Sequence, residues 1–425
     1  MATAYPIRPI SDDEFPAFYG VGEQAFNSAG PSEPERQQGL KIFEFDRSLA
    51  AFDGPDIVGT TAALTFQMTV PGNAAAMAGI TAVGVLPSHR RRGILSSLMR
   101  RQLADIRDRG EAIAALFASE ATIYGRFGYG AATAELDLTI RRGEGVMSGP
   151  AAAAGQGRPG GTVRLRSAEP RAAVAELAKI FDSVLPTRPG MLARDGRWWD
   201  YILWDPEHRR SGNSPVRCVI AEDETGPLGY ALFSVKAAWE DHGIPSGVLQ
   251  VRELMAIDPA AYSGIWNDLL TRDLVSEVRA RVRPADEPLL YLLADRRRAR
   301  PLVVDGLWVR LVRVDQALEQ RRYACAVDVV IEVADDLFAE NAGRWRLRAP
   351  GPAAADGAAP ASCERTSAPA GLALPVWALG AAYLGGTKLS ALAGAGLVTE
   401  MRPGALAALS AAMSWDPAPW SPTGF

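Results

Sequence analysis

Two regular patterns of apolar and polar positions follow each other in residues 78–108. The segment "AGITAVGV" (78–85) is almost continuously apolar, which is typical of a buried strand. It ends at Pro87, and a short polar turn separates it from a helix with one apolar face. The apolar positions of that helix recur every three or four residues, at Ile94, Leu95, Leu98, Met99 and Ile106. The pattern therefore predicts a buried strand, the polar turn "PSHRRRG" and an amphipathic helix.

Similar patterns predict the elements on either side of this strand and helix. "YPIRPI" predicts a strand, and "SDDE" (Ser11 to Glu14) predicts a helix that begins with a capping box. Residues 47–70 predict two strands joined at an Asp-Gly-Pro turn. Residues 112–119 form a near-continuous apolar run of parallel-strand character, and residues 134–140 alternate like a half-exposed strand. The first part of the chain is thus expected to combine a sheet with covering helices.

A later stretch of the chain repeats this layout. Residues 216–236 again predict two strands around a Gly-Pro turn, and "ELMAIDPAAYSGIWNDLL" again predicts a strand, a proline and a helix. Two degenerate copies of one unit explain the repeat. In the second copy, Ala260, Ala261 and Tyr262 take the place of the arginine cluster, whereas Gly264 is retained. We infer from this that the turn itself does not need the arginines.

Changes in composition divide the chain into domains. Residues 144–161 are rich in alanine, glycine and proline and predict a linker, and residues 349–371 predict a flexible loop of similar composition. After Gly306, strand-like and helix-like segments predict a small α+β domain. The expected division is a first domain at 1–143, a linker at 144–161, a second domain at 162–305 and a third domain at 306–425.

The overall composition excludes several classes of protein. The chain has 425 residues, of which 48% are hydrophobic, and a net charge of −4, so it can bury sizeable cores and lacks the basic character of a nucleic-acid-binding protein. We found neither an apolar run of membrane-spanning length nor a signal peptide. The three cysteines are far apart and odd in number, so neither a disulfide framework nor a zinc-ligand spacing can be built from them. We expect a cytoplasmic protein without a nucleic-acid partner, a membrane span or a metal.

The turn at residues 90–93, "RRRG", is the first candidate for chemistry. The first amides of a helix have no intrahelical partner, and the helix N-terminus carries about half a positive charge. Gly93 would allow a ligand close to the backbone, and the arginines would add charge where a pyrophosphate would bind. Two interpretations are open: an exposed basic turn, or a cradle for a phosphate-rich ligand. The position between strand and helix, and the missing arginines in the second copy, favour the cradle.

At this point the motifs resemble a known family. "VGVLPSHRRRGIL" is similar to the acetyl-coenzyme-A motif of GNAT N-acetyltransferases, Arg/Gln-x-x-Gly-x-Gly/Ala, in which Arg90 and Gly93 match and Leu95 departs. Together with "FASEATIYGRFGYGAAT", "DGLWVRLVRVDQALEQRRYA" and the terminal phenylalanine, it resembles the Eis-like (enhanced intracellular survival) acetyltransferases over the whole chain. The resemblance implies an α+β fold of two GNAT domains, the second without a cofactor motif, followed by a sterol-carrier-protein-like domain.

The resemblance also implies a site for acetyl-CoA as co-substrate, without a metal. The backbones of Val83 and Val85 would hold the pantetheine arm. The pyrophosphate would be held by Arg90, Arg91, Gly93 and Ile94, and Ser119, at the end of the next strand, would contact the cofactor as well. Family members also form hexamers, so the resemblance implies a homo-oligomer, with a hexamer as the expected assembly.

Acetyl transfer to an amine needs a base for the ammonium proton and an acid for the departing thiolate. By resemblance, Tyr124 is the acid; a phenol of pKa about 10 can protonate a thiolate whose thiol has a pKa of about 8.5. The carboxylate of Phe425, with a reference pKa of about 3.5, is the implied base. The alternatives are core packing for Tyr124 and a frayed tail for "SPTGF". The longer segment "SWDPAPWSPTGF" has two tryptophans and three prolines, which favour a docked tail. Tyr129 is expected to pack.

Some positions depart from the family pattern. Phe117 stands where some members have a histidine, and Gly424 leaves the terminal carboxylate without an acidic neighbour; Glu23 and Glu44 are candidate compensating acids. The sequence thus predicts an acetyl-CoA-dependent N-acetyltransferase that acts by direct transfer on primary amines of aminoglycoside-like, polyamine-type small molecules. Protein lysines are the alternative substrate, and a non-catalytic protein that binds an apolar ligand is the alternative function.

Overall fold

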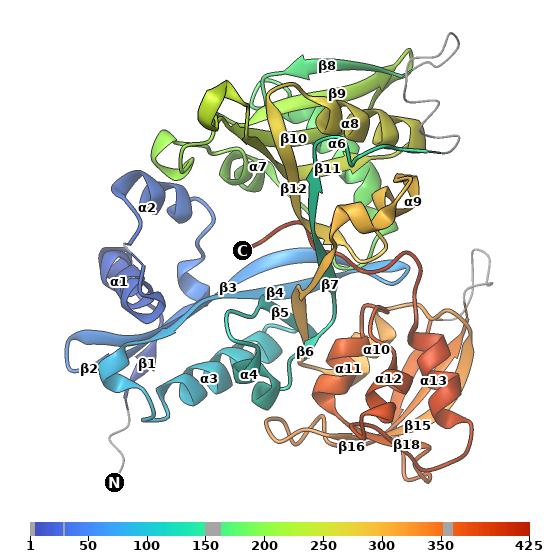
Figure 1. The fold of residues 1–425 in the computed structure, drawn as a ribbon. Helices are drawn as coiled ribbons and strands as arrows, with labels where there is room; N and C mark the ends of the chain where they lie inside the picture. The colour runs from blue at the N-terminus through green and yellow to red at the C-terminus, as the bar shows by residue number, and fades with distance from the viewer. Residues whose placement is uncertain (1–4, 29, 149–162, 352–359) are drawn as a thin grey trace. The chain divides into compact units, whose positions relative to one another are not determined.

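The fold is taken from a computed structural model, which describes residues 5–28, 30–148, 163–351 and 360–425 (Figure 1). Residues 149–161 of the predicted linker and residues 352–359 of the predicted loop lie outside the described residues. The chain forms two compact units. The first unit comprises residues 1–133, 306–419 and 423–425, and the second comprises residues 134–305 and 420–422.

The first unit contains a seven-stranded sheet with the order β1-β2-β3-β4-β5-β14-β6. β4 and β5 are parallel, and every other neighbouring pair is antiparallel. The strands are β1 (Ile7–Arg8), β2 (Ser48–Asp53), β3 (Asp56–Val70), β4 (Asn73–Val85), β5 (Ile113–Phe117), β6 (Gly130–Ala131) and β14 (Leu307–Leu311).

Helices cover both faces of this sheet (Figure 1). α1 (Phe15–Phe26) packs on one face through Phe15, Phe18 and Val21, and the predicted capping box between Ser11 and Glu14 precedes it. α3 (Ile94–Asp108) packs on the other face through the predicted apolar stripe. Two shorter helices, α2 (Glu33–Leu40) and α4 (Ala121–Tyr124), complete this part of the unit.

The parallel strands β4 and β5 separate before they end. Their pairing runs from Met77 and Ile113 to Gly79 and Ala115. β4 then continues to Val85 along β3, where a register shift marks a bulge, while β5 continues along β14. The carboxyl ends of two adjacent strands therefore open into a gap, which leaves backbone amides and carbonyls of β4 accessible to a ligand.

The third region, residues 314–419 of the first unit, has a five-stranded sheet with the order β17-β16-β15-β18-β19. One of its strands, β17, pairs with β16 within residues 349–371, so the prediction of a flexible loop is wrong for this part. The strands are β15 (Ala326–Ala334), β16 (Gly343–Pro350), β17 (Ser362–Arg365), β18 (Leu372–Pro375) and β19 (Thr399–Glu400). The helices are α10 (Val314–Glu319), α11 (Val376–Ala382), α12 (Leu389–Gly394) and α13 (Ala405–Met413).

The second unit has its own seven-stranded sheet, with the order β8-β9-β10-β11-β12-β7-β13 and one parallel pair, β11 and β12. Its core includes the fully buried Trp266. The strands are β7 (Ala134–Arg141), β8 (Arg164–Ala168), β9 (Arg217–Asp223), β10 (Gly226–Lys236), β11 (Gly247–Ala256), β12 (Val275–Pro284) and β13 (Leu302–Asp305). The helices are α6 (Val174–Val184), α7 (Gly196–Ile202), α8 (Pro259–Thr271) and α9 (Leu289–Leu292).

The two sheets have the same arrangement, as the internal repeat predicts, but their sixth strands come from unexpected places. β7 follows the first copy in sequence and pairs with β12 and β13 of the second sheet. β14 follows the second copy and pairs with β5 and β6 of the first sheet. The sequence pattern predicts residues 134–140 as part of the first copy and residues after Gly306 as part of the third region, so both predictions are wrong for these strands. Strand periodicity reports which side chains are buried and carries no information about the pairing partner.

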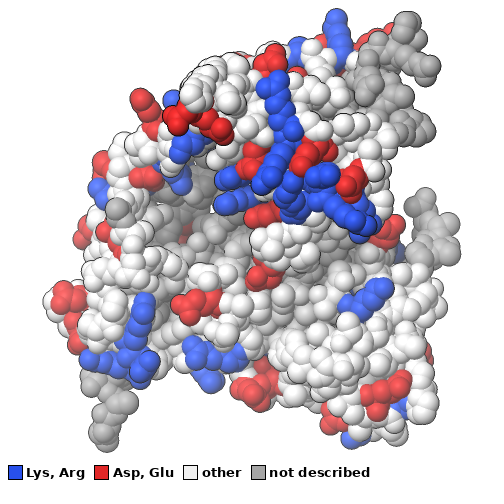
Figure 2. Space-filling model, viewed as in Figure 1, with Lys and Arg blue, Asp and Glu red and all other residues white. Residues whose placement is uncertain are grey.

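Charged side chains on the surface of the second unit are largely mixed. Figure 2 shows basic and acidic groups side by side over β7 and β12. Glu144 pairs with Arg298 at 2.9 Å and with Arg300 at 2.6 Å, and Arg279 pairs with Glu277 at 2.5 Å. These arginines are therefore neutralised by neighbouring acids. Within the described ranges, no helix is both long enough and apolar enough to cross a membrane.

Candidate active site

One cavity of about 630 Å³ in the first unit brings together nearly all of the predicted site residues. Its walls are the end of β4, the turn before α3, the segment around α4 and the end of α1. The predicted residues that line it are Val83, Val85, Arg90, Arg91, Gly93, Ile94, Ser119 and Tyr124. The ninth predicted residue, Phe425, is not one of its lining residues.

The start of α3 is open to a ligand. Gly93 is the N-cap, without a side-chain cap, and the first intrahelical bond runs from the Ser97 amide to the Gly93 carbonyl at 3.0 Å. The preceding amides have no partner inside the helix. Gly93 has a φ of 82°, and Arg91 a φ of 62°, so this turn has two left-handed residues. A Cβ on Gly93 would meet nothing within 4 Å; the glycine is needed for its backbone conformation.

The basic turn is anchored on both sides. Arg90 donates from Nη2 to the carbonyl of Ala25 at 3.1 Å, and Arg92 donates from Nη1 to the Tyr5 hydroxyl at 3.0 Å. Nε2 of His89, in the same turn, lies 3.1 Å from Oδ2 of Asp53. Arg91 is exposed and lines the cavity. The guanidinium groups of Arg90 and Arg92 are therefore held in place, whereas that of Arg91 stays available to a ligand.

The second copy provides an internal comparison. Its helix α8 begins with Asp258 as N-cap, and that carboxylate accepts hydrogen bonds from the amides of Ala260 and Ala261 at 2.8 and 2.9 Å. The residue that takes the place of Gly93 is thus Asp258. Gly264 lies buried inside α8, so its interpretation as the retained turn glycine is wrong. A carboxylate that already occupies these amides would also repel a phosphate.

Tyr124 ends α4, lines the cavity and is 5% exposed as a residue. Burial raises the pKa of Tyr124 above its usual value of 10, and a hydrogen bond with Ser119 partly opposes the shift. The phenol therefore stays protonated at neutral pH. Its ring meets the edge of Tyr129 at a centroid distance of 6.2 Å. Tyr129 is fully buried, as expected of a packing residue.

The terminal residue is docked beside the point where β4 and β5 separate. The Phe425 ring lies 5.1 Å from the Phe66 ring and 5.3 Å from the Phe117 ring, between centroids. A Cβ on Gly79 would lie 2.9 Å from the Phe425 ring. Phe117, the departure from the family pattern, thus gives Phe425 an aromatic partner. The prediction of a docked tail is supported by these contacts.

A second anchor holds the tail a few residues earlier. Trp420 is buried in the second unit, where its amide donates to the Pro189 carbonyl and its indole N–H donates to the Val282 carbonyl, both at 2.8 Å. The Arg283 guanidinium lies 5.2 Å from the Trp420 ring. Trp420 is thus held by two hydrogen bonds, and the prolines at 419 and 422 restrict the backbone on either side of it.

Several contributors to the site were not predicted. The end of α1 supplies one wall through Ala25, Phe26 and Asn27, and Arg126 lines the cavity beside Tyr124. Asn27 caps α1 in a left-handed conformation, a role that asparagine accepts readily. Among the candidate acids, Glu44 accepts hydrogen bonds from the amide and hydroxyl of Thr65, both at 2.7 Å. The Glu23 carboxylate lies against Gly30.

Comparison with known proteins identifies the domains of the chain. Two family models, each described as an acetyltransferase (GNAT) domain, match residues 6–132 and 190–314, and a sterol carrier protein domain matches residues 314–422. An uncharacterized N-acetyltransferase of Streptomyces avermitilis is 44% identical over 99% of each chain. N-acetyltransferase Eis of Mycobacterium tuberculosis is 34% identical over 85% of this chain and 84% of its own.

The chain belongs to the Eis family of N-acetyltransferases. The crystal structure of Eis1 from Mycobacterium abscessus, which is 32% identical, matches 99% of this chain and all of that one with a TM-score of 0.81. The predicted fold class, two GNAT domains followed by a sterol-carrier-like domain, is confirmed. This Eis-family protein is an N-acetyltransferase, and its GNAT domains imply the use of acetyl-CoA. Within the described ranges, no group of His, Cys, Asp and Glu side chains could hold a metal ion.

We expect Arg91→Gln to raise the KM for acetyl-CoA about tenfold with little change in kcat. A charge-assisted hydrogen bond contributes about 1.5–3 kcal/mol, and its loss weakens binding in ground and transition state alike. Arg92→Gln is the matched control, because Arg92 bonds to Tyr5 and does not line the cavity. Steady-state kinetics at saturating amine measure both variants. An equal rise in KM for the two would contradict a specific role for Arg91.

Proposed function

We propose that this Eis-family enzyme transfers an acetyl group from acetyl-CoA directly to a primary amine of a polyamine-type small molecule. Aminoglycoside-like amines are the leading substrates, and protein lysines are the alternative. The observation that carries the proposal is the shared cavity, in which an uncapped helix N-terminus with a nearby guanidinium faces the same space as a protonated, buried phenol.

The cavity residues fit the parts of acetyl-CoA, which supplies the acetyl group as a thioester. The amides at the start of α3, Arg90 and Arg91 would hold the pyrophosphate, since helix N-termini and guanidinium groups bind phosphate oxygens. The edge of β4 at Val83 and Val85, left free where β5 turns away, would hold the amide-containing arm as a neighbouring strand does. Ser119, which bonds to Tyr124, would contact the cofactor as well.

Two groups would move protons. The Tyr124 hydroxyl would donate its proton to the departing thiolate, and its raised pKa keeps that proton available. The Phe425 carboxylate, with a reference pKa of about 3.5, would accept the proton that the attacking amine loses, directly or through water. The cavity lining contains no cysteine that could carry an acetyl group, which favours direct transfer.

An amine screen tests this function. Purified protein and acetyl-CoA are incubated with aminoglycosides, linear polyamines and lysine-containing peptides; free thiol is measured, and mass spectrometry counts the acetyl groups on each product. We expect thiol release with polyamine substrates above that with peptides, and loss of this activity in Tyr124→Phe. Absence of thiol release across the panel would contradict the function, and acetylation of peptides alone would favour the alternative substrate. The hexamer implied by the family resemblance stays a prediction, which light scattering can test.

A further inference from the structure

A buried ion pair lies beneath the segment that carries Tyr124. Arg310 is the fourth residue of β14, paired in register with Ala114 of β5, and its side chain is fully buried. Its Nη2 donates to Oδ2 of Asp335 at 2.5 Å, and the Asp335 side chain is 2% exposed. β14 belongs to the sheet that contains the candidate site, whereas Asp335 follows β15 in the third region. The pair therefore joins the third region to the sheet.

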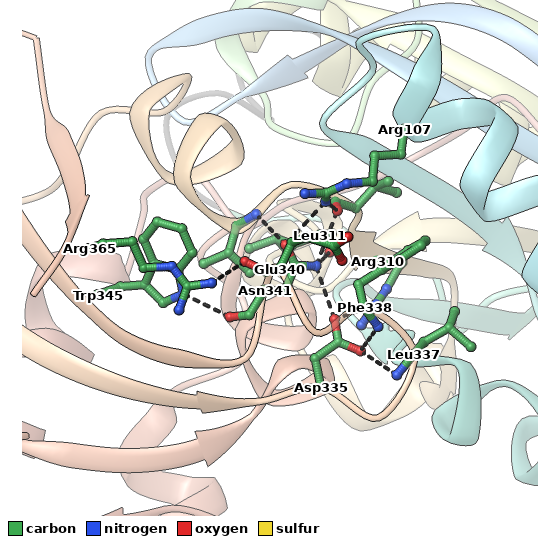
Figure 3. A network of polar contacts seen from close by, with 12 residues as sticks. Arg107, Arg310, Leu311, Asp335, Leu337, Phe338, Glu340, Asn341, Trp345 and Arg365 are labelled. Atoms are coloured by element: carbon green, nitrogen blue, oxygen red, sulfur yellow. Dashed lines mark hydrogen bonds and ion pairs between the residues drawn. The ribbon is translucent and has the colours of Figure 1, made fainter.

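Asp335 is itself fixed by several donors (Figure 3). Its Oδ1 accepts from the amide of Leu337 at 3.0 Å, and its Oδ2 accepts from Nδ2 of Asn341 at 2.9 Å. Asn341 also donates to the Val312 carbonyl at 3.1 Å, directly after β14. The carboxylate that holds Arg310 thus has little freedom to move.

Arg310 in turn lies against Gly128. A Cβ on Gly128 would overlap Nη1 of Arg310, and Gly128 has a φ of 83°, which an L side chain rarely adopts. Gly128 closes the turn after Tyr124: its amide donates to the Gly125 carbonyl at 2.9 Å, and the next amide donates to the Tyr124 carbonyl at 3.3 Å. A chain of direct contacts therefore leads from Asp335 through Arg310 and Gly128 to the backbone of Tyr124.

Gly130, another of the three glycines in this motif, also lies against a distant part of the chain. A Cβ on Gly130 would overlap the Trp377 carbonyl of α11, and a Cβ on Gly380 of α11 would overlap the Val309 carbonyl of β14. Backbones of β6, β14 and α11 thus approach each other as closely as glycine permits. Gly128 and Gly130 thus accommodate groups that lie about 180 to 250 residues later in the chain, whereas a Cβ on Gly125 would meet nothing within 4 Å.

Stability alone is a poor explanation for the ion pair. Nε and Nη1 of Arg310 have no hydrogen-bond partner among the described residues, and burial lowers the pKa of Arg310 despite Asp335. Buried ion pairs with unsatisfied donors are often no more stable than apolar side chains of the same volume. The pair is better explained if it holds the neighbouring Gly128 turn in place.

We propose that the Arg310–Asp335 pair positions the Gly128 turn and thereby the Tyr124 hydroxyl, so that the third region sets the geometry of the acid. This rests on the proposed function only where Tyr124 is concerned; the positioning of the turn stands independently of it. Arg310 and Asp335 do not line the cavity. They are positioning residues.

The first test measures the turn directly. Hydrogen–deuterium exchange of residues 121–131 is compared in wild type, Arg310→Met and Asp335→Asn. Arg321→Met is the matched control, because Arg321 is also fully buried in the first unit, where it donates to the Met413 carbonyl at 2.8 Å. We expect faster exchange of 121–131 in the first two variants only. Asp335→Asn keeps the size of the side chain in case Arg310→Met does not fold.

The second test measures the consequence for catalysis. We expect Arg310→Met to lower kcat on the order of 10- to 100-fold while the KM for acetyl-CoA stays within about twofold, since a small misplacement costs mainly the chemical step. Tyr124→Phe should then add little in the Arg310→Met background, although it is severe in wild type. In the Arg321→Met background, it should keep its full effect.

The outcomes separate the two proposals. Unchanged exchange in residues 121–131, or a full effect of Tyr124→Phe in the Arg310→Met background, overturns the positioning role. Absence of acetyl transfer by the wild type overturns the proposed function, and exchange alone then decides whether Arg310 positions the turn. Equal losses in Arg310→Met and Arg321→Met would identify both arginines as general stabilisers.

Discussion

Tyr124→Phe is expected to lower kcat on the order of 10²- to 10⁴-fold, the usual contribution of a general acid. The substitution removes one hydroxyl and keeps the ring that packs against Tyr129. We therefore expect an unchanged melting temperature and unchanged binding of acetyl-CoA. Stopped-flow or steady-state measurement of thiol release gives kcat, and calorimetry gives the affinity for acetyl-CoA.

The pH dependence provides an independent check. An acid acts when protonated, and the pKa of Tyr124 is raised above 10, so ionisation of the phenol should not reduce kcat anywhere below about pH 10. Tyr383→Phe is the control for the substitution, because it also removes a buried hydroxyl. The Tyr383 hydroxyl has no hydrogen-bond partner among the described residues, and Tyr383 does not line the cavity. A loss of kcat below tenfold in Tyr124→Phe would assign Tyr124 to packing.

Extension of the chain by a single glycine beyond Phe425 is expected to lower kcat on the order of 100-fold or more. One added residue moves the carboxylate by up to about 3.6 Å, a displacement that removes a proton acceptor from its substrate. The Phe425 ring can keep its place between Phe66 and Phe117, so the extension separates the charge from the packing. The same thiol-release assay measures the effect.

Phe425→Leu is the matched variant, because it keeps the terminal carboxylate and loses the aromatic contacts. We expect a smaller loss of kcat, about tenfold, since the charge is retained and only its packing is loosened. If the extended chain retained wild-type kcat, the terminal carboxylate would not be the base. If Phe425→Leu were the more severe variant, the ring would matter more than the charge.

Local patterns predicted the strand, turn and helix of the candidate site closely. The helix was expected after Gly93 and occupies Ile94–Asp108. This prediction was possible because the apolar stripe and the N-cap glycine are both local signals within one short segment. The repeated sheet was also expected. In contrast, Gly264 was matched to Gly93 by spacing alone, although an aspartate can cap a helix as a glycine can, and Asp258 does so.

Features that depend on distant parts of the chain could not be predicted. The motif "IYGRFGYG" was specific in sequence. Its Gly128 and Gly130 are needed, however, because Arg310 and α11 lie where a Cβ would be. Residues 307–311 join the first sheet because they pair with β5, whose edge there has no other partner among the described residues. The alternation of apolar and polar residues within a strand does not indicate its pairing partner. The wall formed by the end of α1 could not be predicted, because Ala25, Phe26 and Asn27 form no recognisable sequence motif.

The origin of β14 has a consequence for how the protein is made. β5 and β6 leave the ribosome long before the strand that separates them, because residues 132–306 are synthesised in between. At about 5–20 residues per second, this interval lasts roughly 10–35 seconds. During that time the nascent chain exposes the hydrogen-bonding edge of β5, which is a template for mispairing. Translation speed over the middle of the message and chaperone access to that edge are therefore expected to influence the yield of active enzyme.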